Sequence, residues 1–177
     1  YEISDELITH WLEKYDPSEQ TISVTGSATA SSNPDTLIVV LGVESESQTA
    51  NESLLNNSNL LNSVISSLTS YGISEDDIQT SNFRIYPLYD SIKDSNDNYQ
   101  QILIGYHVSN ILSIQTDKID SAGNIIDIAV SSGANRVDNV SFQLSEDKLQ
   151  KIADGLIADA INDATQKAEK ALVPLKQ

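Results

Sequence analysis

Two hydrophobic periodicities follow one another along the chain, and they restrict the fold more than any other feature. In some segments every second residue is apolar, which is typical of a strand with one buried face. In others apolar residues recur every three or four positions, as on one face of a helix. After an N-terminal amphipathic helix the order is β-β-α-β-β-α-β-α. This order predicts an α+β fold, with an antiparallel-rich sheet of about five strands and helices packed on one face.

Five segments have the pattern of strands. The first alternates small apolar residues with Ser and Thr, which indicates one solvent-exposed face. The second is apolar on both faces at its start, so we expect it at the centre of the sheet. A turn at Asn33-Pro-Asp35 joins these two as a hairpin, and a polar loop at 90–98 separates the third from the fourth. The predicted strands are 21–30, 36–46, 78–89, 102–116 and 137–144.

Local end signals define three helices after the second strand. Thr49 and Glu52 form a capping box that opens the first, and Gly72 is placed to end it after Tyr71. The second helix begins at Thr116 or Asp117 and is closed by the segment 131–135. These signals are local, so they predict helix ends but not what each helix packs against.

The last helix is opened by Ser145 and stopped by Pro174. Its apolar stripe is narrow and rich in alanine, which suits close packing on a sheet. We therefore predict that residues 21–177 form an α+β domain whose final strand is missing from this chain.

Residues 1–20 have a separate helical pattern that ends at Asp16-Pro17. Such a short helix is marginal alone, so its apolar stripe needs a partner. We predict a helical extension that lies across an interface between copies of the chain; the alternative is that it folds back on its own sheet. The predicted interface residues are Ile3, Leu7, Ile8, Trp11, Leu12 and Tyr15.

The composition excludes several kinds of function. The 177 residues carry a net charge of −16, and so acidic a protein repels nucleic acid, which we do not expect as a partner. There is no cysteine, hence no disulfide, thiol nucleophile or thiolate metal site, and only His10 and His107 are imidazoles. The chain also lacks methionine, so we expect a processed product or a fragment.

Other features favour a location outside the cytoplasm. No run of about 18 apolar residues is present, so we expect no direct membrane insertion of this fragment. Asn51, Asn56 and Asn139 each begin an N-glycosylation sequon, although a chain rich in Ser and Asn also produces such triplets by chance. Together with cysteine avoidance and acidity, these features predict a secreted or cell-envelope protein.

The sequence offers no convincing catalytic or metal-binding motif. Asp94-Ser-Asn96-Asp-Asn98 resembles the start of a calcium loop, but Tyr99 and Gly105 occupy the positions of the required glycine and glutamate, so a solvated hairpin loop is the better interpretation. Glu44 and Glu46 share one strand face and are most simply an exposed strand end. No nucleophile elbow or phosphate-binding loop occurs. We therefore expect no enzymatic activity, no cofactor and no metal.

Aromatic residues on the central hairpin suggest an alternative role. Such residues either pack as cross-strand pairs or line a concave surface for a small ligand of unknown identity. The residues of this candidate ligand surface are Tyr86, Tyr89, Tyr99 and Tyr106.

An ordered series of short motifs from about Thr21 to Lys176 resembles the SIMPL domain family. Most of these motifs are turn or helix-end sequences, which indicates a shared architecture more than a shared reaction. The motifs are Thr21-Ile-Ser-Val-Thr-Gly26, Asn33-Pro-Asp35, Gly42-Val-Glu44, Gly72-Ile-Ser-Glu-Asp-Asp-Ile-Gln-Thr80-Ser, Tyr86-Pro-x-Tyr89, Gly105-Tyr106, Ser109-Asn110, Gly133-Ala-Asn135 and Val140-Ser-Phe142.

The resemblance implies an α+β fold, an envelope or secreted location and self-association into rings or larger homo-oligomers, with no catalytic residues to carry over. Bacterial members are periplasmic or outer-membrane-associated and linked to oxidative stress. Residues 1–20 lie outside the pattern, and similar chains tend to continue beyond Gln177 into a further strand. We therefore expect a non-enzymatic protein that assembles with copies of itself into a ring, tube or filament; the alternative is a stress-related binding module for a small ligand or partner.

Overall fold

The computed structural model describes residues 21–93 and 98–173. The predicted N-terminal helix, residues 94–97 of the predicted hairpin loop and the last four residues lie outside these ranges. The chain forms two compact units, one of residues 32–148 and one that joins the segment 21–31 to residues from Leu149 onward. Each unit is described by itself.

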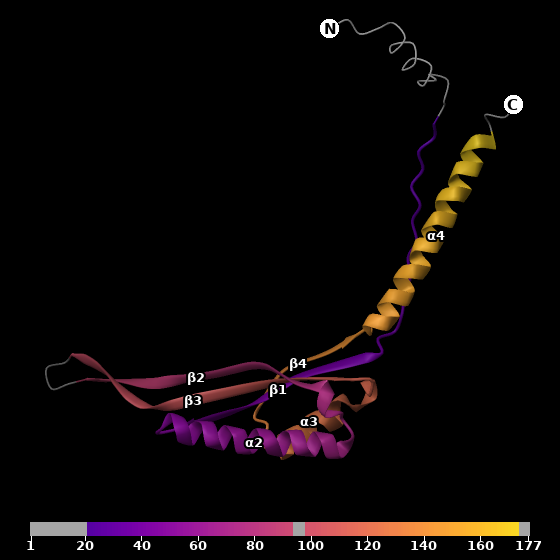
Figure 1. Ribbon diagram of the computed structural model, residues 1–177. Coiled ribbons are helices and arrows are strands. Elements are labelled where there is room, and N and C mark those ends of the chain that lie inside the picture. The colour runs from indigo at the N-terminus through magenta and orange to yellow at the C-terminus, as the bar shows by residue number, and fades with distance from the viewer. Residues whose placement is uncertain (1–20, 94–97, 174–177) are drawn as a thin grey trace, which may run out of the picture. The chain divides into compact units, whose positions relative to one another are not determined.

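The larger unit contains an antiparallel sheet of four strands: β1 (Thr36–Ser47), β2 (Ile78–Lys93), β3 (Tyr99–Thr116) and β4 (Arg136–Gln143). Their spatial order is β2-β3-β1-β4, and each neighbouring pair is antiparallel (Figure 1). The predicted α+β class is confirmed, but the prediction of about five strands is wrong, because the structure has four in the part of the chain that it describes.

The predicted strand that is missing from the sheet is the segment 21–30. It is extended but belongs to no sheet in the structure. In its own unit it lies against the last helix, where the Ser27 amide donates to Asp163 Oδ2 (2.8 Å) and Lys167 Nζ donates to the Thr25 carbonyl (3.1 Å). Alternating apolar residues require an extended backbone with one covered face, but they do not specify whether a sheet or a helix covers it.

Strand β1 occupies the centre of the sheet, as predicted from its apolar start, and pairs with β3 on one side and β4 on the other. One face of β1 and β3 supplies half of the core cluster, and the helices with the turns that follow them supply the other half. The core cluster consists of Leu37, Val39, Leu41, Val43, Val64, Leu68, Ile73, Leu112, Ile114, Ile125, Ala129 and Ala134.

Helices α2 (Ala50–Tyr71) and α3 (Ala122–Ser131) cover this face of the sheet (Figure 1). Both predicted ends of α2 are confirmed. The Thr49 hydroxyl accepts from the Glu52 amide (3.3 Å), and Gly72 adopts a left-handed conformation (φ 97°) that returns its amide to the last turn. Helix α3 begins later than predicted because the 3₁₀ turn Ile119–Ser121 precedes it.

Helix α4 (Glu146–Leu172) begins as predicted, with the Ser145 hydroxyl accepting from the Lys148 amide (3.3 Å). None of its residues is buried. Within its unit, the small stripe lies against the extended segment, where Gly26 meets Ala160 and Ala164. The stripe thus makes the close contact that its small residues allow, and the contact described is with an extended segment rather than with the predicted sheet.

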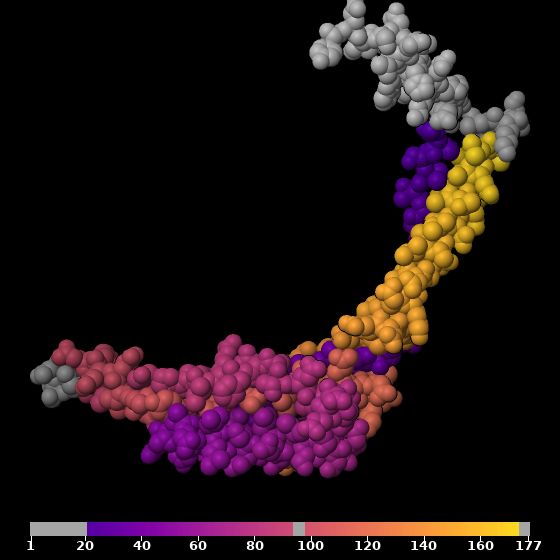
Figure 2. Space-filling model, viewed as in Figure 1, coloured from indigo at the N-terminus to yellow at the C-terminus, as the bar shows by residue number. Residues whose placement is uncertain are grey.

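Strands β2 and β3 form a longer hairpin than predicted, because Asp90–Lys93 belongs to β2 and Tyr99–Gln101 to β3. Both arms of this hairpin project beyond the N-terminal end of α2 (Figure 2). Residues in these arms are exposed to solvent, so a polar composition does not prevent them from pairing as strands.

Candidate functional site

The sheet face opposite α2 and α3 carries a cluster of charged and polar side chains. Strand register assembles it: Glu44 of β1 stands opposite Ser109 of β3, and Glu46 stands opposite His107. His107 is in turn opposite Tyr86 of β2. Directly opposite residues in antiparallel strands point to the same face. The cluster is therefore a product of pairing between strands that are far apart in the sequence.

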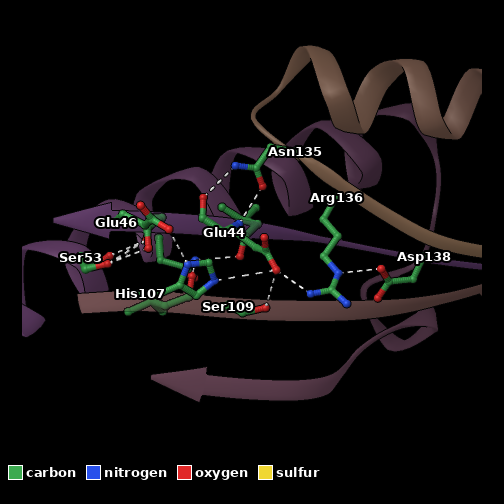
Figure 3. Close-up of polar contacts among 12 residues, drawn as sticks. Glu44, Glu46, Ser53, His107, Ser109, Asn135, Arg136 and Asp138 are labelled. Atoms are coloured by element: carbon green, nitrogen blue, oxygen red, sulfur yellow. Dashed lines mark hydrogen bonds and ion pairs between the residues drawn. The ribbon is translucent and has the colours of Figure 1, made fainter. Parts of the chain in front are cut away.

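His107 lies at one end of the cluster and is largely buried. Its ring stacks on Tyr86, with centroids 4.8 Å apart and planes inclined by 22°. Its Nδ1 lies 3.0 Å from Glu46 Oε1, and its Nε2 lies 3.9 Å from Glu44 Oε1 (Figure 3). These contacts hold both the imidazole and the Tyr86 ring in place.

Arg136 of β4 lies at the other end of the cluster, where it links the carboxylates of Glu44 and Asp138. Its Nη1 donates to Glu44 Oε1 (2.5 Å) and its Nε donates to Asp138 Oδ1 (2.6 Å) (Figure 3). The Arg136 hydrogen bond, more than its charge or the Ser109 hydroxyl, holds the pKa of Glu44 below its ordinary value. The two carboxylates raise the pKa of Arg136. Glu44 and Arg136 are therefore both charged at neutral pH.

The side chain of Asn135 holds the backbone of Glu44 in place. Its Oδ1 accepts from the Glu44 amide (2.7 Å), and its Nδ2 donates to the Glu44 carbonyl (2.8 Å). The side chain thus imitates a paired strand at the point where β4 begins. This contact gives Asn135 a structural role two residues after Gly133, whose positive φ of 119° lies in the turn that follows α3.

The lowered pKa of Glu44 predicts a pH-dependent stability. Because the folded pKa lies below the unfolded one, the contribution of Glu44 is present above the unfolded pKa and is lost as pH falls through the folded pKa. The difference in unfolding free energy between wild type and Glu44→Gln should therefore shrink as pH falls from 6 to 3, measured by urea denaturation. In an Arg136→Gln background the same difference should depend less on pH; equal pH dependence in both backgrounds would contradict the assignment.

A groove of about 310 Å³ lies beside this cluster on the open face. Side chains from all four strands of the sheet line it, and two of them are aliphatic. The lining residues are Val40, Glu44, Ser81, Asn82, Arg84, Tyr86, Ser109, Ile111, Arg136 and Asp138.

Comparison with known proteins gives a consistent result. The sequence model of SIMPL, described as a protein of unknown function (DUF541), matches residues 22–176. The chain belongs to the SIMPL family. It is 28% identical over 142 residues to the 26 kDa periplasmic immunogenic proteins of Brucella melitensis and Brucella abortus, a match that covers 76% of this chain and 57% of each relative. The chain thus spans somewhat more than half the length of these SIMPL relatives.

The names of these relatives place them in the periplasm, in agreement with the extracytoplasmic location predicted from the sequence. The location of this SIMPL protein is accordingly secreted or cell-envelope. Among the residues that the structure describes, no helix is both long and apolar enough to cross a bilayer. Residues 21–93 and 98–173 also contain no group of three or more His, Asp or Glu residues arranged to hold a metal ion.

The structure separates the four tyrosines of the predicted ligand surface. Tyr86 lines the groove, but the other three do not. Tyr106 stands opposite Pro87, one position from the Tyr86–His107 pair, and therefore points to the other face of the sheet. Tyr99 lies at the far end of the hairpin beneath Lys93, and Tyr89 is exposed beyond the irregularity that follows Leu88.

The predicted interface residues of the N-terminal helix, and His10 with them, lie outside the described residues, so that interface stays a prediction. The three sequon asparagines Asn51, Asn56 and Asn139 are all exposed. Asn139 Nδ2 also lies within 3.3 Å of the Ser141 hydroxyl of its own sequon. Use of these sites stays a prediction as well.

Sequence reasoning missed the charged residues of the groove. Glu44 is not simply an exposed strand end, since it accepts from Arg136 and Ser109. Arg84 lies on β2 and Asp138 on β4, and neither belongs to a motif that indicates a site from the sequence alone. The only signal was the alternation of polar residues on what proved to be one strand face, and it identifies a site only once the register is known.

Proposed function

We propose that this SIMPL-family protein is a non-enzymatic extracytoplasmic protein that assembles with copies of itself into a ring, tube or filament. The observation that carries the proposal is the extended segment 21–31. Within the described residues it makes no backbone-to-backbone hydrogen bond. An extended backbone without partners presents a row of donors and acceptors that pairs readily with another strand.

The two edges of this segment differ. In an extended chain the N–H and C=O of one residue point to the same edge, and successive residues alternate between edges. The edge that carries Thr25 and Ser27 is partly satisfied by the α4 side chains of Lys167 and Asp163. The edge that carries the backbone groups of Val24, Gly26 and Ala28 is the one we assign to strand pairing between copies.

Charge supports a copy of the chain as the partner. Residues 21–34 contain no charged side chain, so two such strands can approach although the whole protein carries a net charge of −16. The edge strand β2 differs, because it contains Arg84, Pro87, Asp90 and Lys93, the kinds of residue that discourage edge-to-edge pairing. If the same edge of two copies pairs with itself, the contact closes as a twofold dimer. A ring or filament forms when this edge pairs with a different surface of the next copy, as a ring if the rotation closes and as a filament if it does not.

The non-enzymatic part of the proposal rests on the pairing within the open-face cluster. Arg136 pairs with both Glu44 and Asp138, and His107 lies between carboxylates beside Tyr86. A general base or nucleophile needs to face the space where a substrate sits. Glu44 and Asp138 line the groove, but each accepts a hydrogen bond from Arg136, as expected for a structural network.

Proline substitution tests the assigned edge. Ala28→Pro removes an N–H from that edge and should raise the dissociation constant of the assembly by about tenfold or more, since a lost ladder bond is accompanied by a ring that obstructs pairing. Thr29→Pro removes an N–H from the other edge and should assemble like wild type. Sedimentation velocity over a concentration series measures both variants. Equal assembly of Ala28→Pro and wild type would contradict the proposed pairing.

A further inference from the structure

The groove on the open face has the dimensions of a small binding site. Its volume of about 310 Å³ lies at the lower end of the range for ligand sites, so it suits a molecule of the size of one sugar ring. The lining is mostly polar and contains few apolar groups. Its polar members are the charged residues Glu44, Arg84, Arg136 and Asp138 and the uncharged residues Ser81, Asn82 and Ser109. A hydrophilic ligand therefore fits better than an apolar one.

The two arginines that line the groove differ in their partners. Arg136 is occupied by Glu44 and Asp138. The side chain of Arg84, which lines the same groove from β2, forms no hydrogen bond or ion pair with any residue that the structure describes. A free guanidinium in a concave site presents a planar fork of donors that matches a carboxylate. The groove thus offers one cationic group to a ligand in an otherwise strongly acidic protein.

Asn82, Arg84 and Tyr86 alternate along the edge strand, so all three point to the open face. Tyr86 is held by its stack on His107, which is itself held by Glu46. Its side chain nevertheless remains 44% exposed and lines the groove. A ring that is fixed before binding loses little conformational freedom when a ligand packs against it.

The opposite wall restricts the ligand further. Glu44 and Asp138 are carboxylates with acceptor capacity beyond their bonds to Arg136. They repel a second negative charge but accept hydrogen bonds from hydroxyl groups. We propose that the groove binds a small hydroxylated carboxylate of the sugar-acid class, with its carboxylate on Arg84, its ring against Tyr86 and its hydroxyls toward Glu44 and Asp138. This site does not depend on self-assembly.

Titration with D-galacturonate, galactose and inorganic phosphate tests the proposal, with binding measured by calorimetry and by amide chemical shifts. We expect galacturonate to bind with a dissociation constant of about 1 mM, a scale set by the small number of atoms in one sugar ring. Galactose lacks the carboxylate and phosphate lacks the ring, so both should bind at least about tenfold more weakly.

Two variants that each remove one positive charge distinguish a contact in the groove from the overall electrostatic field of the protein. Arg84→Gln should weaken galacturonate binding by about tenfold or more, whereas Lys93→Gln, on the same strand but outside the groove, should leave it unchanged. Tyr86→Ala should also weaken binding without changing the preference for galacturonate over galactose. The proposal is overturned if galacturonate does not bind, if galactose or phosphate binds equally well, or if Arg84→Gln binds like wild type.

Discussion

Asn57→Ala is expected to lower the free energy of unfolding by about 2–3 kcal/mol, the largest loss from any single polar group in the fold. Asn57 projects from α2 into the core and is only 1% exposed. Its Nδ2 donates to the carbonyls of Val43 on β1 (2.8 Å) and Val108 on β3 (3.3 Å). Alanine removes both bonds and leaves buried carbonyls without a donor from this helix.

Asn59→Ala provides the matched control, because it makes the same change at an exposed position of the same helix. Alanine is the better helix former, so this variant should be as stable as wild type or slightly more stable. Chemical denaturation of both variants measures the difference. An Asn57→Ala variant that unfolds at the wild-type denaturant concentration would show that Asn57 does not join α2 to the sheet.

Gly26→Ala is expected to detach the extended segment from α4. A Cβ at this position would overlap the carbonyl oxygen of Ala160 and lie 2.9 Å from the Ala164 Cβ, and the helix backbone cannot move aside cheaply. The segment would therefore shift, and the bonds from Ser27 to Asp163 and from Lys167 to Thr25 would break. Hydrogen exchange of the Ser27 amide should become about tenfold faster or more.

Gly155→Ala makes the same substitution on α4 where the added Cβ meets no atom within 4 Å. It should leave the exchange of the Ser27 amide unchanged or slow it, because the helix gains about 1 kcal/mol of propensity. Similar exchange in the Gly26→Ala and wild-type proteins would mean that this glycine is not required for the contact with α4.

Features with a local cause were predictable from the sequence. The start and end of α2 follow from the Thr49 side chain and from the freedom of Gly72, which need no distant partner. The central place of β1 follows from apolar residues on both of its faces, which only a covered strand tolerates. The family resemblance rests on the same kind of residue, and the match over residues 22–176 confirms it.

Features that depend on distant pairing were not predictable. The alternation in the segment 21–30 indicated a strand, but the partner in its unit is a helix about 130 residues later, as the 136-residue separation of Ser27 and Asp163 shows. The groove likewise combines Arg84 of β2 with Arg136 of β4, and these meet only because β3 and β1 lie between them in the sheet. No spacing along the chain encodes that order.

The four tyrosines show the same limit on a smaller scale. They were grouped because they lie near one another in the sequence of the hairpin. One position of register separates the face of Tyr86 from that of Tyr106, and an irregularity after Leu88 changes the alternation before Tyr89 is reached. Only Tyr86 therefore contributes to the groove.

Self-assembly is tested most directly by the molar mass of residues 1–177 in solution, measured by size-exclusion chromatography with light scattering over a concentration series. The unpaired edge of the segment 21–31 predicts a particle whose mass is several times the 19.3 kDa of one chain and which Ala28→Pro, but not Thr29→Pro, shifts toward the single chain. A wild-type protein that remains at 19.3 kDa at high concentration would contradict the proposed function.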